Sequence, residues 1–111
     1  MPYVHLNASR SLTDAEIAAL RDDVAALMPL LPGKTRENTM IHITGGCAIS
    51  KGDPSVPALF IEVRTYKASP DEAKKEFAAR LTAMLSEKLG VPGENIYMNI
   101  IAMDEWFSGR K

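Results

Sequence analysis

Apolar residues recur at helical spacing in two segments of the chain, and each segment opens with residues that favour a helix start. Steps of three and four residues between apolar positions after Thr13 predict a helix with one apolar face. That face carries Ile17, Leu20, Val24, Leu27, Met28 and Leu31. Thr13 and Glu16 have the spacing of a capping box, which satisfies free N–H groups at a helix start. Pro29 predicts that the helix loosens near its end, before Pro32-Gly33 stops it.

The second segment repeats this pattern after residue 68. Ser69 is expected to cap the helix, with Pro70 at its first position and Glu72 closing a second capping box. Its apolar face carries Phe77, Leu81, Met84 and Leu85. Gly90 is expected to end this helix, because glycine readily adopts the left-handed conformation that terminates many helices.

Four short runs rich in β-branched and aromatic residues predict strands. These runs are Tyr3–Leu6, Thr39–Ile43, Ala58–Val63 and Ile96–Ile101. Between them, residues 7–10, 34–38 and 47–56 contain polar residues, glycine and proline and are expected to be loops. The last of these loops is expected to hold one short edge strand around Ala48–Ser50.

The two halves of the chain are one strand–helix–strand unit written twice. A shift of 57 residues aligns them without a gap; it pairs Val4 with Ile61, Leu20 with Phe77, Gly33 with Gly90 and Ile43 with Ile100. A βαβ unit joins parallel strands through a right-handed crossover, and each amphipathic helix buries its apolar stripe on the sheet. The sequence therefore predicts an α/β (α+β) fold in one domain, 1–111. Its two repeats, about 2–44 and 58–104, form a four-stranded mixed sheet with both helices on one face.

The strand at 58–63 and the last strand carry apolar residues on both sides, which is typical of strands that are buried on both faces. Two helices can cover only one face of a four-stranded sheet. The other face would then expose more apolar surface than soluble monomers usually do. We therefore expect a homo-oligomer that packs through the helix-free face of the sheet.

Composition and charge narrow the functional classes. The 111 residues are 46% hydrophobic and 24% charged, with a net charge of −1, so no basic surface for nucleic acid is expected. No run is long and apolar enough for a membrane span, and no signal peptide is visible. Cys47 stands alone, which suits a reducing, cytoplasmic location. No cofactor and no metal site are expected, and His5 and His42 are interpreted as ordinary strand residues.

Pro2 is the chain's most distinctive chemical candidate. Methionine is commonly removed before a small residue such as proline, and removal of Met1 would leave a secondary amine fixed at the start of a strand. An α-amino group titrates near ~8, and burial with a nearby cation would lower that pKa, which suits a general base near neutral pH. A strand that simply begins with proline is the structural alternative. If Met1 is retained, its amide removes the basic nitrogen.

These features together resemble the tautomerase superfamily, and specifically its macrophage migration inhibitory factor (MIF) branch. The resemblance covers the chain up to about Asp104. It is carried by Pro2, the Gly33-Lys34 turn, the Ala58-Leu59 strand start and the repeat itself. The most distinctive motif is Val91-Pro92-Gly93-Glu94-Asn95-Ile96-Tyr97-Met98-Asn99, a turn followed by Tyr-x-Asn.

The resemblance implies a symmetric homotrimer with three sites at its subunit boundaries, acting on a small α-keto acid such as phenylpyruvate by keto–enol tautomerisation. Pro2 would be the catalytic base and Lys34 a cation near the substrate carboxylate, while Tyr97 and Asn99 would come from the neighbouring subunit. It also leaves secretion by a non-classical route open. Structural roles for Lys34, Tyr97 and Asn99 are the alternatives.

The chain also departs from the family pattern. Arg64 stands where the MIF branch usually has a small neutral residue, and it is expected either to bind a carboxylate or to be a surface charge. Thr65, Trp106 and Phe107 are further candidates for the pocket, although the tail after Asp104 is shorter than the family's usual ending. Two other functions stay open: a non-catalytic binding or signalling protein on the same scaffold, and an isomerase or dehalogenase of small unsaturated acids.

Overall fold

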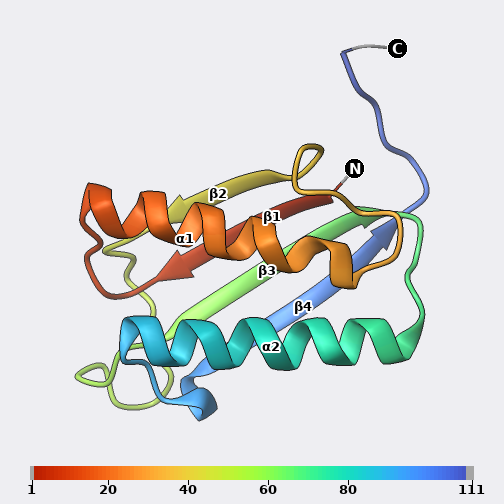
Figure 1. Cartoon of the computed structure of the whole chain (residues 1–111). Coiled ribbons are helices and arrows are strands. Elements are labelled where there is room, and N and C mark those ends of the chain that lie inside the picture. The colour runs from red at the N-terminus through yellow and green to blue at the C-terminus, as the bar shows by residue number, and fades with distance from the viewer. Residues whose placement is uncertain (1, 110–111) are drawn as a thin grey trace.

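Two helices lie on one face of a four-stranded sheet in the computed structural model, which describes residues 2–109 (Figure 1). The elements in chain order are β1 (Pro2–Ala8), α1 (Asp14–Leu27), β2 (Met40–Thr44), β3 (Leu59–Tyr66), α2 (Asp71–Leu89) and β4 (Ile96–Met103). Met1, on which the expected N-terminal processing falls, and the last two residues of the tail lie outside the described residues. Within the described residues, neither helix is long and apolar enough to cross a lipid bilayer.

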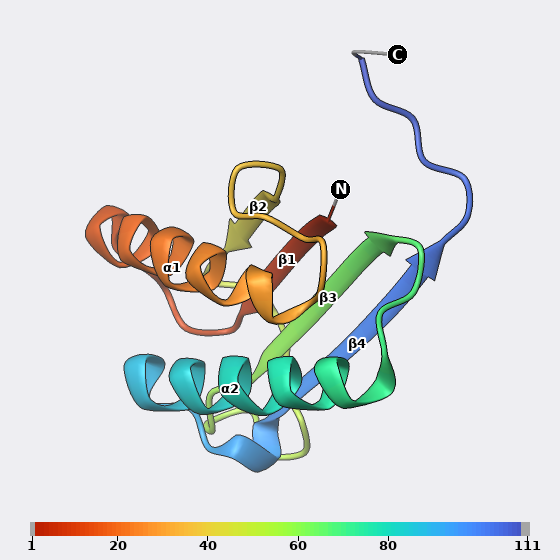
Figure 2. The same ribbon diagram turned by 45° about the vertical axis from the view of Figure 1, so that its right-hand side comes forward.

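The strand order β2-β1-β3-β4 confirms the predicted duplication (Figure 2). β1 and β2 are parallel, β3 and β4 are parallel, and the two repeats meet where β1 and β3 run antiparallel. The register repeats as well, because Tyr3 pairs with Met40 in the first repeat and Phe60 pairs with Tyr97 in the second. Both pairs differ by the same shift of 57 residues found in the sequence.

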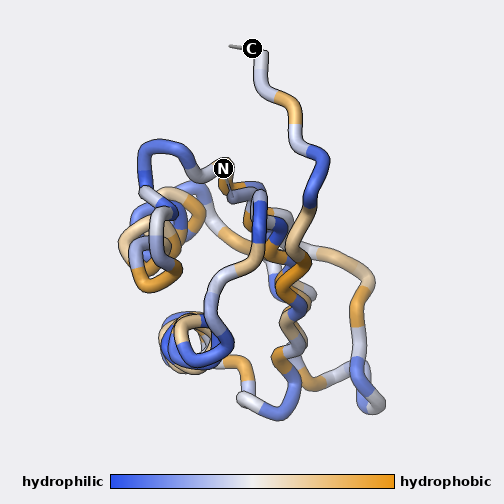
Figure 3. The backbone as a smooth tube through the Cα atoms, turned by 90° about the vertical axis from the view of Figure 1, so that its right-hand side faces the viewer, coloured by the Kyte–Doolittle hydropathy of each residue, from blue (hydrophilic) through white to orange (hydrophobic). Residues whose placement is uncertain are grey.

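The core lies between the sheet and the helices, and Figure 3 shows both helices on the same side of the sheet. Alternate residues of β1 and β3 point into this layer, since side chains of a strand alternate between its two faces. The helices contribute the stripe predicted from the sequence. The largest side chains of the core include Leu6, Leu20, Met28, Ile61, Phe77, Leu81 and Leu85. Burial of each such side chain contributes about 1.5–3 kcal/mol, so this layer is the main stabilising interaction of the fold.

The two helix starts differ from one another. The capping box predicted for α1 is confirmed, because Thr13 Oγ1 accepts from the Glu16 amide while the Glu16 carboxylate accepts from the Thr13 amide. The box predicted for α2 is wrong. Pro70 is the N-cap residue there, no side chain caps the helix, and the Ser69 hydroxyl is buried without a partner among the described residues.

The helix ends follow the prediction. A 3-10 turn at Met28–Leu30, which contains Pro29, succeeds α1, because proline cannot donate the next helical hydrogen bond. Gly90 ends α2 with a left-handed φ of 65°, as expected.

Several strand boundaries were predicted wrongly. β1 continues through Asn7 and Ala8, which were expected in a loop, and β3 continues through Arg64, Thr65 and Tyr66. Each strand is longer than its apolar run because β1 and β3 pair along their whole length, and backbone hydrogen bonds need no apolar side chain. β2 is shifted by one residue to Met40–Thr44, and β4 runs on to Met103. No edge strand forms at residues 48–50.

The helix-free face of the sheet is more polar than expected. β1 presents Tyr3, His5 and Asn7 there, between buried residues that face the helices. On β3, Glu62 and Arg64 belong to the same face. Large apolar or aromatic side chains are exposed on this face at separate positions: Met40, Tyr66, Tyr97 and Ile101. The expected oligomer therefore stays a prediction, and its interface would be of mixed polarity rather than a continuous apolar layer.

The contrast between the two helix starts yields the first prediction. Thr13→Ala should lower the free energy of unfolding by about 1 kcal/mol, because the substitution removes the side-chain acceptor of the capping box. Urea unfolding at fixed protein concentration measures this change. Ser69→Ala is the matched control and should cost nothing, since the Ser69 hydroxyl has no described partner to lose. Equal losses in the two variants would contradict this account.

Candidate functional site

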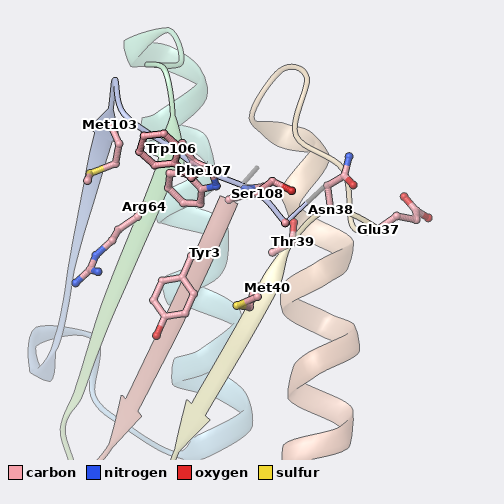
Figure 4. A pocket seen from close by; sticks show the side chains of 12 residues that line it. Tyr3, Glu37, Asn38, Thr39, Met40, Arg64, Met103, Trp106, Phe107 and Ser108 are labelled. Carbon is pink, nitrogen blue, oxygen red and sulfur yellow. The ribbon is translucent and has the colours of Figure 1, made fainter. Parts of the chain in front are cut away.

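A pocket of about 860 Å³ opens at the edge of the sheet where β1 begins (Figure 4). Four segments form it: the start of β1, the turn before β2 with the start of β2, the end of β3, and the end of β4 with the chain that follows it. The lining residues are Pro2, Tyr3, Glu37, Asn38, Thr39, Met40, Arg64, Met103, Trp106, Phe107, Ser108 and Gly109. Aromatic and thioether side chains thus form much of the wall, with one cation among them.

Pro2 lies at the wall of this pocket because it is the first residue of a central strand. Proline is tolerated there, since its missing N–H removes no essential bond of the ladder. Pro2 is buried, and its partner across the β1–β3 ladder is Thr65. Thr65 is 2% exposed, and its hydroxyl donates to the Lys67 carbonyl oxygen at 2.9 Å. Thr65 therefore supports the strand end beside Pro2 and does not line the pocket.

Arg64 does line the pocket, directly across the ladder from Tyr3. Its guanidinium carbon lies 5.8 Å from the centroid of the Tyr3 ring, and its Nη2 donates to Glu62 Oε1 at 3.3 Å. The side chain is 46% exposed. A guanidinium has five N–H donors in a planar fork, so it retains the capacity to bind a carboxylate from the pocket side.

The other predicted site residues do not line this pocket. Lys34 Nζ donates to the Tyr66 carbonyl oxygen at 3.0 Å, next to the strand position that pairs with Pro2. Tyr97 and Asn99 are exposed on β4. Pro2 pairs with Thr65 of β3, and Thr65 pairs with Ala102 of β4. Tyr97 is five residues from Ala102, so it lies roughly 16 Å along β4 from the level of Pro2. A single copy of the chain therefore does not bring Tyr97 to Pro2.

Sequence reasoning missed part of the pocket wall. Trp106 and Phe107 line it as expected, but Tyr3, Met40 and the turn residues Glu37 and Asn38 were not foreseen as lining residues. Only their positions in the sequence could have predicted this role. Tyr3 follows Pro2, and the turn leads into β2, which pairs with β1. Cys47 lies outside this pocket and donates its thiol proton to the Thr44 carbonyl oxygen at 3.5 Å.

His5 and His42 lie in strands, as expected, and they also contact one another. They are direct partners in the parallel β1–β2 ladder, and their rings stack with centroids 3.7 Å apart and planes 4° apart. Burial lowers the pKa of His5, and the neighbouring His42 and Arg64 lower it further. Glu62, whose Oε2 lies 3.5 Å from His5 Nδ1, opposes this shift in pKa because a carboxylate favours the charged imidazole.

Comparisons with known proteins show which family this chain and its fold resemble. A family model described as macrophage migration inhibitory factor (MIF) matches residues 1–111. A MIF homolog of Trichuris trichiura is 31% identical over 71 residues, which cover 64% of this chain and 62% of that protein. The crystal structure of Leishmania major MIF2 has a TM-score of 0.89 at 22% identity, covering 98% of this chain and 94% of its own.

A further solved structure, described as Pt0534 inactivated by 2-oxo-3-pentynoate, has a TM-score of 0.82 at 16% identity. The match covers 96% of this chain and 93% of that one. At such identities, the two solved structures establish the likeness of fold alone.

The environment of His5 yields the second prediction. Glu62→Gln should lower the pKa of His5 further, because it removes the carboxylate that favours the imidazolium. NMR titration of the two imidazoles measures this shift, with Glu72→Gln on α2 as a control that should leave the pKa unchanged. Since the pKa of His5 is lower in the folded than in the unfolded state, stability should fall as pH drops below about 6.5, and more steeply in Glu62→Gln. A rise in the pKa of His5 in Glu62→Gln would contradict this account.

Proposed function

The chain belongs to the macrophage migration inhibitory factor family, and on that premise we propose that it is a keto–enol tautomerase of phenylpyruvate-type α-keto acids. One observation carries the proposal: Pro2 stands at the wall of a largely aromatic pocket that also holds a cation, Arg64. Removal of Met1 would free the Pro2 nitrogen to act as the general base. The pocket volume of about 860 Å³ is ample for a phenyl ring with a three-carbon keto acid.

The reaction moves one proton between carbon and oxygen. In the enolising direction, the Pro2 amine takes a proton from the carbon next to the keto group, and the electron pair of that C–H bond moves into the enolate. Pro2 is buried beside the strand end that Lys34 contacts, and both features favour the neutral amine that a base requires. A rigid ring on a central strand also loses little entropy when the nitrogen is aimed at the substrate.

Cations and hydrogen-bond donors complete the proposed site. The carboxylate of the substrate would bind Arg64 from the pocket side, or Lys34 if the Lys34 ammonium exchanges its Tyr66 carbonyl for a substrate oxygen. Donors that face the keto oxygen stabilise the enolate as negative charge develops there. Thr65 has a supporting role in the proposal, since its hydroxyl is already engaged by the Lys67 carbonyl.

Tyr97 and Asn99 enter the proposal through a second copy of the chain. Their distance from Pro2 within one copy, and their exposure on the helix-free face of β4, support a site completed at a subunit boundary. We therefore include a homotrimer in the proposal, with each Pro2 pocket receiving Tyr97 and Asn99 from a neighbour. In a cyclic trimer, every subunit gives and receives the same contact, so three equivalent sites result.

A second candidate reaction is the isomerisation or dehalogenation of a small unsaturated acid. Arg64 is the observation that favours it, because a guanidinium in the pocket can polarise a carboxylate and so activate the adjacent double bond. A non-catalytic binding or signalling role on the same scaffold is the other alternative. Both alternatives predict little or no phenylpyruvate turnover by protein that has a free Pro2 amine.

The third prediction tests Pro2 directly. Protein shown by mass spectrometry to begin at Pro2 should convert phenylpyruvate between its enol and keto forms, and Pro2→Ala should reduce turnover at least 100-fold. Pro92→Ala, the same change in the loop before β4, should keep full activity. The free amine should also be modified by 2-oxo-3-pentynoate, with the added mass on the N-terminal peptide. Full turnover in Pro2→Ala would rule out the Pro2 base.

The fourth prediction tests the shared site. Pro2→Ala and Asn99→Ala should each be nearly inactive alone, whereas mixed oligomers refolded from equal amounts should regain roughly a quarter of the sites, because one pocket then combines an intact Pro2 with a neighbour's intact Asn99. Light scattering should give three times the chain mass. A monomeric mass at micromolar concentration, or no recovery in mixed oligomers, would contradict the shared site.

A further inference from the structure

A chain of polar side-chain contacts crosses the helix-free face of the sheet, with Tyr3 of the Pro2 pocket at one end and Glu62 at the other. It starts at Tyr3, whose hydroxyl lies 2.8 Å from His42 Nδ1. The other ring nitrogen of His42, Nε2, lies 3.4 Å from Thr44 Oγ1. Thr44 Oγ1 also lies 3.0 Å from His5 Nε2, and His5 Nδ1 lies 3.5 Å from Glu62 Oε2. Four side chains on β1 and β2 thus connect the pocket to a carboxylate on β3.

When both histidines are neutral, only one assignment of donors and acceptors allows a hydrogen bond at every contact from Tyr3 to Glu62. The ionised Glu62 carboxylate can only accept, so the proton of neutral His5 is on Nδ1 and its Nε2 is an acceptor. The single Thr44 hydroxyl proton must then go to His5 Nε2, which leaves the Thr44 oxygen to accept from His42 Nε2–H. His42 Nδ1 is consequently an acceptor, and the Tyr3 hydroxyl donates to it. The tautomers of both histidines follow from this network.

Protonation of either histidine breaks the chain. An imidazolium has two donors and no acceptor, so charged His42 cannot accept from Tyr3, and charged His5 cannot accept from Thr44. Two imidazolium rings stacked at 3.7 Å would also repel one another. The lowered pKa of His5, caused mainly by burial, favours its neutral form. The other titratable or charged groups that face the pair are Tyr3 on β1 and Glu62 and Arg64 on β3.

The pocket end of the chain contacts the cation of the site. Tyr3 and Arg64 are partners across the β1–β3 ladder, and Figure 4 shows both side chains beside the pocket. The Tyr3 ring lies under the guanidinium, and Glu62 holds the same guanidinium from β3. The hydrogen bond at its hydroxyl fixes the Tyr3 ring, and the fixed ring is an aromatic platform that orders Arg64. Because Arg64 is already ordered, it loses less conformational entropy when it binds an anion.

We propose that His42 is a positioning residue of the Pro2 pocket: by accepting the hydrogen bond of Tyr3 it holds the platform for Arg64, so that carboxylate binding weakens when His42 is protonated. The proposal rests on the proposed function in one respect, the binding of a carboxylate by Arg64. The substrate class that it favours is an aromatic monocarboxylate, whose ring meets Trp106 and Phe107 while its charge meets Arg64.

Charge alone would act in the opposite direction, because a protonated histidine attracts an anion. His42 and Arg64 lie on either side of β1, so their backbones are about 10 Å apart or more. At that distance, attraction through water with salt present changes affinity less than about twofold. Loss of the Tyr3–His42 hydrogen bond changes it by roughly three- to tenfold. Loss of the Tyr3–His42 hydrogen bond should therefore outweigh the electrostatic attraction, and protonation should weaken carboxylate binding.

The test measures binding rather than turnover. Trp106 is the single tryptophan of the chain and lines the pocket, so its fluorescence reports binding of 3-phenylpropanoate, an aromatic monocarboxylate with no keto group. Between pH 7.5 and 5.5 the Kd of the unmodified protein should rise three- to tenfold. Tyr3→Phe keeps the ring but loses the donor, so its Kd should be high at both values of pH.

Two further variants make the result specific. His42→Gln offers an acceptor that does not titrate, so its Kd should stay nearly constant between the two values of pH. Arg64→Gln should weaken binding and remove the pH step. Above pH 7, NMR should find the proton of His5 on Nδ1 and that of His42 on Nε2. The same pH step in Tyr3→Phe as in the unmodified protein, binding that survives Arg64→Gln, or the opposite tautomers would each overturn the proposal.

Failure of the proposed function gives a different pattern. If protein with a free Pro2 does not turn over phenylpyruvate, the tautomerase proposal fails while the binding and tautomer results still decide the role of His42. If turnover is normal but the Kd does not depend on pH, the role of His42 fails and the tautomerase proposal stands.

Discussion

The antiparallel pairing of β1 with β3 is the interaction on which the rest of the structure depends. It joins the two repeats, makes both strands central in the sheet, and gives the helices one continuous apolar surface to cover. The same register also composes the site. Pro2 faces Thr65 and Tyr3 faces Arg64 in adjacent rows, so the candidate base and the cation of the pocket are brought together by backbone hydrogen bonds alone. A slip of one residue would exchange the two faces of the strand and remove Tyr3 from the pocket.

The residues that stabilise the fold and most of the polar residues near the candidate site lie on opposite faces of the sheet. Apart from Thr65, the residues of β1 and β3 that point toward the helices are apolar, whereas most of their neighbours on the helix-free face are polar. Tyr3, His5 and Glu62 can therefore interact without a cost to the core. The expected trimer, if formed through this face, would place that polar network near the subunit boundary, where the site would also be completed.

Much of the fold could be predicted because its determinants are local or periodic. The Thr13 capping box, the Gly90 helix end and the 57-residue repeat all leave direct marks in the sequence. Most of the misses depend on contacts between distant residues, although the α2 capping box, a local motif, was also predicted wrongly. Ladder pairing, not composition, lengthens β3 through Arg64 and stacks His5 on His42. Pro2 could be recognised as a candidate from its position in the sequence. The contact of Tyr3 with Arg64 could not be predicted, because it depends on the register between β1 and β3, which the sequence of neither strand determines by itself.

The central claim is that the Pro2 amine is the base. The most direct measurement compares two titrations of protein that lacks Met1: the pH dependence of kcat/KM for phenylpyruvate, which reports the essential base of the free enzyme, and the NMR titration of ¹⁵N-labelled Pro2. The account predicts one shared midpoint, below the ~8 of an ordinary α-amino group. A Pro2 amine that titrates at or above that value, while the rate follows a different group, would contradict it.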